Sequence, residues 1–342
     1  MRVAINGFGR IGRLVMRAAQ ANSDIEIVAV NDITDAKTLA HLLIYDSIHG
    51  NFPKVVHAKE GALIVNEREI AVLAERDPAK LPWKRLGVDM VVESTGLFTT
   101  KEAASKHLDA GARRVIVSAP CKGKDPMKTI VMGVNHEMYD PEKDTVVSNA
   151  SCTTNCLAPM AKVLHDAYGI EHGFMLTAHS YTGDQALVDG PHRDLRRARA
   201  AAINLIPTTT GAASAIGEVI PALKGKLDGL AIRVPTPDAS LTDLTVRVNR
   251  DATVQDVNEA FGEQASNGML GVLEYIDEPL VSSDIIGNPH SAVFDSLLTM
   301  VVDRRLVKVL AWYDNEWGYA NRIVDLLVYM DKLKMRKPLP RM

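Results

Sequence analysis

The sequence predicts a two-domain α/β protein. We expect a doubly wound, parallel sheet in the first half and an α+β domain with a mixed or antiparallel sheet in the second. In the first half, short apolar runs alternate with helical patterns, which is typical of right-handed βαβ units. After residue 152 the runs are longer and alternate apolar with polar residues, which favours a mixed or antiparallel sheet. The length of 342 residues suits two domains of roughly 100–200 residues each.

The expected elements of the first half begin with a strand at 3–6, a helix at 11–21 and a strand at 25–31. Later apolar runs predict buried strands at 90–94, 115–118, 130–134 and 146–149. The second half begins with a helix at 153–168 that ends at Gly169. It continues with a strand at 174–180, an Arg-rich polar stretch at 182–199, strands at 241–248 and 307–312, and an amphipathic helix at 317–333.

Composition narrows the class of protein. A hydrophobic content of 46% and a charged content of 24% are typical of soluble globular proteins. The net charge of −3 argues against nucleic acid or an acidic membrane as the main partner. There is no apolar run near ~18 residues and no signal-peptide layout at the start. Three cysteines fit a reducing compartment, so we expect a cytoplasmic protein without a membrane anchor.

A glycine motif, G-x-G-x-x-G, joins the first strand to the first helix through Gly7, Gly9 and Gly12. Gly7 would allow the tight turn, Gly9 would let backbone N–H groups reach a pyrophosphate, and Gly12 would let the helix pack on the strand. The helix start adds partial positive charge. The motif predicts a Rossmann-type dinucleotide site; the alternative is a glycine-rich turn that binds nothing.

Asp32 ends the second apolar run, twenty positions after Gly12. This interval is typical of the acid that accepts hydrogen bonds from the adenosine ribose. A carboxylate there would repel the 2′-phosphate of NADP, so the sequence favours NAD, although neighbouring residues can overturn that preference. A simple turn residue is the alternative.

Cys152 follows a strand and begins a helix in the segment 148–156. At a helix start the dipole lowers a thiol pKa, and a nearby histidine would lower it further. This corner would also expose the thiol at the sheet edge where ligands lie in open α/β folds. The alternative is a small buried apolar residue, the role that we expect for Cys156. No His/Cys set has ligand spacing, so no metal is expected.

The segment 150–156, Ala-Ser-Cys-Thr-Thr-Asn-Cys, resembles the active-site signature of glyceraldehyde-3-phosphate dehydrogenases. The similarity covers nearly the whole chain and includes residues 5–12, 93–96, 179–182, 206–213, 233–237 and 312–319. It implies an NAD-binding domain at 1–150, completed by the C-terminal helix 316–333, and a catalytic domain at 151–315. It also implies a homotetramer in which residues 182–203 form an interface loop beside the cofactor.

The resemblance also implies roles for individual residues. Cys152 would be the nucleophile and His179 its base and later acid. The cofactor contacts would be Gly7, Gly9, Arg10, Ile11, Gly12, Asp32, Arg76, Ser118 and Asn315. The substrate phosphate would bind Thr182 and Arg233, and inorganic phosphate would bind Ser151, Thr153, Thr210 and Gly211, with Arg197 shared.

Some of these roles have independent support from the residues. The hydroxyls at 208–210 lead into an Ala-rich helical pattern at 212–223, and a helix start with free N–H groups can bind an anion. Arg233, at a strand end, could bind a phosphate through two donors. Alternatives remain: His179 could be a core histidine, Thr210 an N-cap, and the arginines of 193–199 a solvated or interface face.

The expected reaction is therefore the NAD-dependent oxidative phosphorylation of D-glyceraldehyde 3-phosphate to 1,3-bisphosphoglycerate, through a thioester on Cys152. Three alternatives remain open. An erythrose-4-phosphate dehydrogenase would favour water as the acyl acceptor. An NADP-using or dual-cofactor enzyme is suggested by Gly183 and Gly190-Pro191, which differ from commoner NAD-type loops. A non-catalytic, RNA-binding protein would use the Arg-rich stretch.

Overall fold

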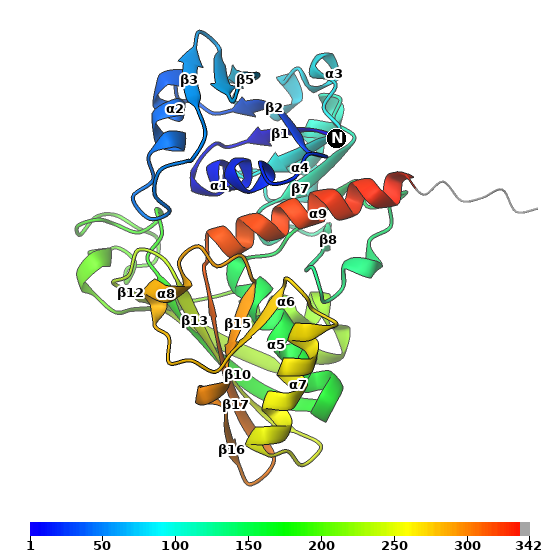
Figure 1. Ribbon diagram of the computed structural model, residues 1–342, viewed down its shortest axis with the longest axis vertical. Coiled ribbons are helices and arrows are strands. Elements are labelled where there is room, and N and C mark those ends of the chain that lie inside the picture. Colours follow the sequence, from blue (N-terminus) through cyan, green and yellow to red (C-terminus); the bar gives the residue numbers. More distant parts are fainter. Residues whose placement is uncertain (336–342) are drawn as a thin grey trace, which may run out of the picture. The chain divides into compact units, whose positions relative to one another are not determined.

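The computed structural model describes residues 1–335, which form two compact units (Figure 1). Unit 1 contains residues 1–130, 137–150 and 320–335. Unit 2 contains residues 131–136 and 151–319. The end of the sequence, 336–342, lies outside the described residues. In the described part of the chain, no helix combines the length and the apolar character that crossing a bilayer requires.

Unit 1 contains a sheet with the order β3-β4-β5-β2-β1-β6-β7-β9-β8. From β5 to β8 all neighbouring strands are parallel, whereas β3, β4 and β5 pair antiparallel at one edge. The strands are β1 (Arg2–Asn6), β2 (Glu26–Asn31), β3 (Val56–Lys59), β4 (Ala62–Val65), β5 (Arg68–Leu73), β6 (Met90–Glu93), β7 (Arg114–Val117), β8 (Lys128–Thr129) and β9 (Val146–Ser148). The predicted doubly wound parallel sheet is confirmed, with an antiparallel edge that the sequence did not predict.

The helices of unit 1 connect these strands. They are α1 (Arg10–Ala19), α2 (Ala36–Ile44), α3 (Trp83–Leu86) and α4 (Lys101–Asp109), with a short 3₁₀ turn at η1 (Pro78–Lys80). A second 3₁₀ turn, η2 (His136–Met138), begins at the last residue of a unit 2 segment and continues into unit 1. The last helix, α9 (Trp317–Met335), contributes its residues from 320 onward to this unit. Apolar residues of β1, β6 and β7 are almost fully buried, which is typical of strands covered on both faces.

One predicted strand is wrong. Residues 130–134 are apolar, but the strand ends at Thr129 and a turn follows. The Val131 N–H donates to Asn135 Oδ1 at 2.8 Å, and Gly133 has φ +78°. A local side-chain bond and a left-handed glycine therefore replace the sheet ladder over this segment.

Unit 2 contains a mixed sheet with the order β11-β12-β10-β13-β17-β15-β14, and β16 pairs with β17. The pairs β10–β12 and β14–β15 are parallel, and the other pairs are antiparallel, which confirms the predicted mixed sheet. The strands are β10 (Ile170–Ser180), β11 (Ile206–Thr209), β12 (Leu227–Val234), β13 (Ser240–Val248), β14 (Leu273–Ile276), β15 (Ala292–Asp295), β16 (Met300–Val302) and β17 (Leu306–Tyr313). Strand β10 begins four residues before the predicted 174–180.

The helices of unit 2 are α5 (Cys152–Tyr168), α6 (Ala212–Val219), α7 (Val254–Ser266) and α8 (Ser282–Ile285), with 3₁₀ turns η3 (Ala201–Ile203), η4 (Pro221–Leu223) and η5 (Ser296–Leu298). Helix α5 packs against α6, α7 and the central strands (Figure 1). The helix predicted at 212–223 ends at Val219, because Pro221 has no N–H to continue it. On β10 and β12, Phe174, Leu176 and Leu230 remain exposed.

Candidate active site

Cys152 is the first residue of α5, as its sequence context predicted. Strand β9 ends at Ser148, and the chain turns through Ala150, which has φ +57°. Ser151 then caps the helix, since its Oγ accepts the Thr154 N–H at 3.1 Å. The corner therefore places the Cys152 thiol in the first turn of a 17-residue helix.

His179 lies at the end of β10 and faces this thiol. The distance from His179 Nε2 to Cys152 Sγ is 3.5 Å, and that from Nδ1 to the Ser180 carbonyl oxygen is 2.7 Å. Nδ1 also lies 3.1 Å from Arg233 Nη1, which can only donate, whereas the carbonyl oxygen can only accept. The carbonyl contact is the shorter of the two, and we therefore assign the ring proton to Nδ1. Nε2 is then unprotonated and oriented to accept a proton from sulfur.

Burial controls the charges of this pair. Burial raises the pKa of the Cys152 thiol, while the nearby Arg233 guanidinium opposes that rise. Burial, and then the charge of Arg233, lower the pKa of His179 to about 3. The ligand-free pair is therefore a neutral thiol facing a neutral imidazole. The sequence-based expectation of a lowered thiol pKa is wrong for this state, because desolvation outweighs the charge of Arg233 and the hydrogen bonds of Thr153, which lower the pKa.

Arg233 lies on β12 directly beside His179, to which it is matched in register. Its Nη1 donates to the Ser180 carbonyl at 3.1 Å and to Thr182 Oγ1 at 2.9 Å. Its Nε is buried without a hydrogen-bond partner. The structure thus brings together residues from three separate stretches of the sequence: Cys152, the pair His179 and Thr182, and Arg233.

Arg197 reaches this cluster through Asp184, a residue that the sequence analysis did not select. Arg197 Nη1 pairs with Asp184 Oδ2 at 2.8 Å, and Thr182 Oγ1 donates to the same carboxylate. Arg197 Nε also donates to Thr208 Oγ1 at 2.9 Å. Asp184 lies two positions after Thr182, and this short spacing is the sequence signal that could have indicated the bond between Thr182 and Asp184.

Other predicted residues of unit 2 are held by local bonds. The hydroxyls of Thr153 and Thr177 each lie 2.9 Å from the Tyr313 hydroxyl, which the sequence analysis also missed. The Tyr313 ring meets His179 edge to face, with centroids 6.1 Å apart. Thr210 Oγ1 accepts the Ala212 N–H at 3.2 Å, but the N-cap position of α6 is Gly211, so Thr210 is not the N-cap that the sequence suggested as an alternative.

Two further residues lie in the same unit. Gly211 is the exposed N-cap position of α6 and has no side chain to cap it. Asn315 is buried, and its Oδ1 accepts hydrogen bonds from Ser180 Oγ at 2.8 Å and Ser240 Oγ at 2.7 Å. No direct contact joins Thr210, Gly211 or Asn315 to Cys152 among the hydrogen bonds of the described residues.

In the glycine motif of unit 1, Gly7 and Gly12 lie where neighbouring atoms leave no room for a side chain, as the sequence predicted. Gly7 has φ +89°, and a Cβ there would lie 2.6 Å from the Thr95 nitrogen. A Cβ on Gly12 would lie 2.2 Å from the Gly7 carbonyl oxygen. Gly9 faces open space and is the N-cap of α1, without a side-chain cap. The α1 start therefore has N–H groups directed at an accessible region.

A cavity of about 310 Å³ lies beside this turn. It is lined by Asn6, Gly7, Gly9, Asn31, Asp32, Ile33, Glu75, Arg76, Ser94, Thr95, Leu97 and Phe98. Asp32 accepts the Phe8 N–H at 2.9 Å, which fixes its carboxylate at the cavity wall. Four predicted residues, Gly7, Gly9, Asp32 and Arg76, line this cavity.

The other predicted cofactor residues of unit 1 do not line it. Arg10 forms an ion pair with Asp46 at 3.1 Å, and Ile11 and Gly12 follow within α1. Ser118 lies after β7, where its N–H donates to the Glu93 carbonyl at 2.9 Å. Several lining residues, among them Asn6, Asn31 and Thr95, were not selected from the sequence as ligand contacts.

Together, the fold and these sites define a class: α/β proteins with a dinucleotide-type glycine turn in one unit and a cysteine–histidine pair in the other. Comparison of the chain with known protein families identifies one family for both units. Residues 1–101 match the NAD binding domain of glyceraldehyde 3-phosphate dehydrogenase, and residues 151–315 match its C-terminal domain. The chain belongs to the glyceraldehyde-3-phosphate dehydrogenase family, and it is an NAD-dependent oxidoreductase.

Individual relatives agree over nearly the full length. The chain is 58% identical to a glyceraldehyde-3-phosphate dehydrogenase of Geobacillus stearothermophilus, covering 96% of this chain and 98% of the relative. It is 59% identical to glyceraldehyde-3-phosphate dehydrogenase 2 of Streptomyces arenae, covering 95% and 97%. It is 55% identical to glyceraldehyde-3-phosphate dehydrogenase 2 of Bacillus subtilis (strain 168), covering 99% and 98%.

Proposed function

We propose that this enzyme oxidises D-glyceraldehyde 3-phosphate and transfers the acyl group to inorganic phosphate, through a thioester on Cys152. The observation that carries this proposal is the pair of contacts of His179. Its Nδ1 is fixed on the Ser180 carbonyl, and its unprotonated Nε2 lies 3.5 Å from Cys152 Sγ. A positioned neutral base next to a thiol is suited to nucleophilic attack on an aldehyde carbon.

The residues of unit 1 fit NAD. The uncapped start of α1 can bind a pyrophosphate through backbone N–H groups, and Asp32 can accept hydrogen bonds from a ribose. We assign cofactor contacts to Gly7, Gly9, Arg10, Ile11, Gly12, Asp32, Arg76, Ser118 and Asn315. Bound NAD supplies the hydride acceptor for the oxidation. Because two serines bond to Oδ1 of Asn315, its amide Nδ2 is the donor left for a ligand.

His179 moves the protons of the first half-reaction. Nε2 accepts the thiol proton as Sγ adds to the aldehyde carbon, and it returns that proton to the aldehyde oxygen, which gives a hemithioacetal. Nε2 then removes the hydroxyl proton as the carbon loses a hydride, and the product is a thioester of Cys152. The Nδ1–H bond to Ser180 holds the ring in the required tautomer throughout.

Two anion sites near one thiol support phosphate as the acyl acceptor. Arg233 and Thr182 would bind the phosphate of the substrate, because the Arg233 Nε–H has no protein partner and lies beside the Cys152–His179 pair. We assign inorganic phosphate to Ser151, Thr153, Thr210 and Gly211, with Arg197 shared between the two anions. The uncapped start of α6 at Gly211 supports this second site.

Omitting phosphate tests the identity of the acyl acceptor. We expect NADH formation to stop after roughly one turnover per active site, because the thioester then has no efficient acceptor. Adding phosphate should restore steady turnover, and adding arsenate in its place should do the same. Stopped-flow absorbance of NADH measures both phases. Continued oxidation at the full rate in phosphate-free buffer would instead assign water as the acceptor.

Replacing Arg233 tests the substrate phosphate site and the thiol charge together. In Arg233→Met we expect KM for the substrate to rise roughly 10–100-fold, the loss typical of a charge-assisted hydrogen bond. Because the Arg233 charge lowers the pKa of Cys152, its removal raises that pKa and moves the iodoacetamide alkylation profile to higher pH. Arg233→Lys retains the charge and is the matched control. An unchanged alkylation profile in Arg233→Met would contradict this electrostatic role.

We further propose a functional division and a quaternary state. Residues 1–150 with the C-terminal helix 316–333 would bind NAD, and residues 151–315 would carry the chemistry. A homotetramer is supported by the apolar side chains left exposed on one sheet face, since Phe174 is 70% and Leu230 is 43% exposed. The three free cysteines support a cytoplasmic location, because a reactive thiol requires a reducing compartment.

A further inference from the structure

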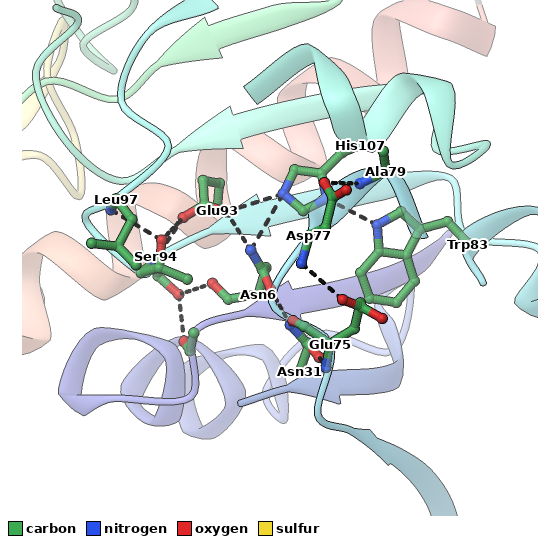
Figure 2. A network of polar contacts seen from close by, with 12 residues as sticks. Asn6, Asn31, Glu75, Asp77, Ala79, Trp83, Glu93, Ser94, Leu97 and His107 are labelled. Carbon is green, nitrogen blue, oxygen red and sulfur yellow. Dashed lines mark hydrogen bonds and ion pairs between the residues drawn. The ribbon is translucent and has the colours of Figure 1, made fainter. Parts of the chain in front are cut away.

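The carboxyl ends of three parallel strands in unit 1 are joined through their side chains (Figure 2). Strands β2, β1 and β6 end at Asn31, Asn6 and Glu93, and Asn6 is in register with both of the others. Asn31 Nδ2 donates to Asn6 Oδ1 at 2.6 Å, and Asn6 Nδ2 donates to Glu93 Oε2 at 2.5 Å. We call these three buried residues the amide ladder; it runs across the edge of the sheet where the cavity lies.

The Glu93 carboxylate is the acceptor at one end of the ladder, and it is 1% exposed. Oε2 receives the Asn6 amide and His107 Nε2, the latter at 3.0 Å. Oε1 receives the Thr95 N–H at 2.9 Å and the Thr95 hydroxyl at 2.5 Å. A buried carboxylate is costly unless its lone pairs are satisfied, and these four donors satisfy them.

Trp83 determines which nitrogen of His107 carries the proton. Its indole Nε1–H can only donate, and it lies 3.0 Å from His107 Nδ1. Nδ1 is therefore the acceptor, and Nε2 carries the hydrogen that is donated to Glu93. His107 is fully buried and contacts no residue of the Cys152 site. The proposed catalytic mechanism gives this histidine no role.

The same carboxylate supports the glycine turn. Glu93 Oε1 holds Thr95, and the Gly7 backbone lies so close to Thr95 that a Cβ on Gly7 would be 2.6 Å from its nitrogen. Ser94 Oγ donates to the Gly7 carbonyl at 2.7 Å. Asn6, Ser94 and Thr95 all line the cavity, whereas Glu93, His107 and Trp83 do not.

We propose that Glu93, oriented by His107 and Trp83, is a positioning residue for NAD, which rests on the proposed cofactor site of unit 1. The carboxylate does not contact the cofactor. It fixes the Asn6 amide and the Thr95 backbone, and through them the Gly7 turn that receives the pyrophosphate. Removing the His107 donor leaves Glu93 Oε2 with the Asn6 amide alone, so the carboxylate reorients and the turn loses its fixed conformation.

Two variants of His107 test this role through NAD binding, measured by titration calorimetry on the full-length protein. His107→Leu removes the donor, and we expect Kd for NAD to rise about tenfold. His107→Gln retains an N–H that can reach Glu93, and Kd should remain within about threefold of the parent. The exposed His41→Leu in the same unit is the control. Parent-like affinity in His107→Leu, or equal losses in the leucine and glutamine variants, would overturn the proposal.

A second measurement on the parent enzyme needs no activity. Imidazole ¹⁵N shifts of His107 should show an unprotonated Nδ1 and a protonated Nε2, and Trp83→Phe should remove that preference. The opposite tautomer in the parent would overturn the proposal. Thermal unfolding midpoints distinguish the positioning role from a general loss of stability. A general loss of stability would lower the midpoint, but it would leave Kd for NAD unchanged at temperatures well below the midpoint. If the parent itself does not bind NAD, the proposed cofactor site is wrong. If the parent binds NAD and His107→Leu binds it equally well, only the positioning role is wrong.

Discussion

Replacing Cys152 by serine is expected to lower kcat on the order of 10⁴-fold or more, because a hydroxyl is a far weaker nucleophile than sulfur. His179 Nε2, which lies 3.5 Å from Sγ, would still face the new hydroxyl, so the position of the base alone would not restore the reaction. NAD binding should be unaffected, since Cys152 is not among the residues that line the cavity of unit 1. Initial rates with glyceraldehyde 3-phosphate and NAD, combined with mass spectrometry of the trapped acyl-enzyme, measure the effect.

Cys156 provides the matched control for this substitution. It lies one turn later in α5, is fully buried, and contacts Met160 Sδ at 3.9 Å and the Ala311 carbonyl at 3.8 Å. Cys156→Ser should therefore alter stability by about 1–3 kcal/mol and leave kcat nearly unchanged. If Cys152→Ser retained activity, or if both variants lost it equally, the covalent role of Cys152 would be wrong.

Replacing His179 by asparagine is the second large effect, with kcat expected to fall about 10²–10⁴-fold. The asparagine amide can still donate to the Ser180 carbonyl, which Nδ1 of His179 contacts at 2.7 Å. It places no basic atom near Cys152 Sγ, so the thiol and hemithioacetal protons have no acceptor. KM should change little, because Arg233 and Thr182 keep their mutual contact.

Single-turnover kinetics separate this effect from a binding defect. The burst of NADH should become slow in His179→Asn while substrate affinity remains, and alkylation of Cys152 should also slow at neutral pH. A variant with a burst rate within tenfold of the parent would assign the proton transfers to another group. Thermal unfolding of both proteins controls for loss of the fold, since His179 is buried.

Local patterns predicted the parts of the sites that depend on the backbone. The glycine turn required only the spacing of Gly7, Gly9 and Gly12, and the Cys152 corner required only a strand followed by a helix. Both signals lie within a dozen residues, where periodicity and turn chemistry determine the structure. The same is true of Ser151, whose capping bond joins residues three apart.

Contacts between distant strands could not be predicted in this way. Thr153 and Tyr313 meet only because α5 packs on the sheet that contains β17, and Arg233 reaches His179 only through the register of β10 and β12. Registers are set by the packing of the whole unit. Burial is likewise a property of the folded unit, which is why the raised pKa of Cys152 could not be predicted from local patterns.

The amide ladder has a consequence for the entropy of ligand binding. The side chains of Asn31, Asn6 and Glu93 each have a single orientation dictated by the donors and acceptors of their neighbours. Their rotamers are therefore ordered when unit 1 folds, and not when a dinucleotide arrives. For Asn6 and Asn31, which line the cavity, this preorganisation avoids about 0.5–1.5 kcal/mol of ordering cost for each side chain at the time of association. The entropy cost of ordering these side chains would then fall on the folding of unit 1 and not on the binding of the dinucleotide.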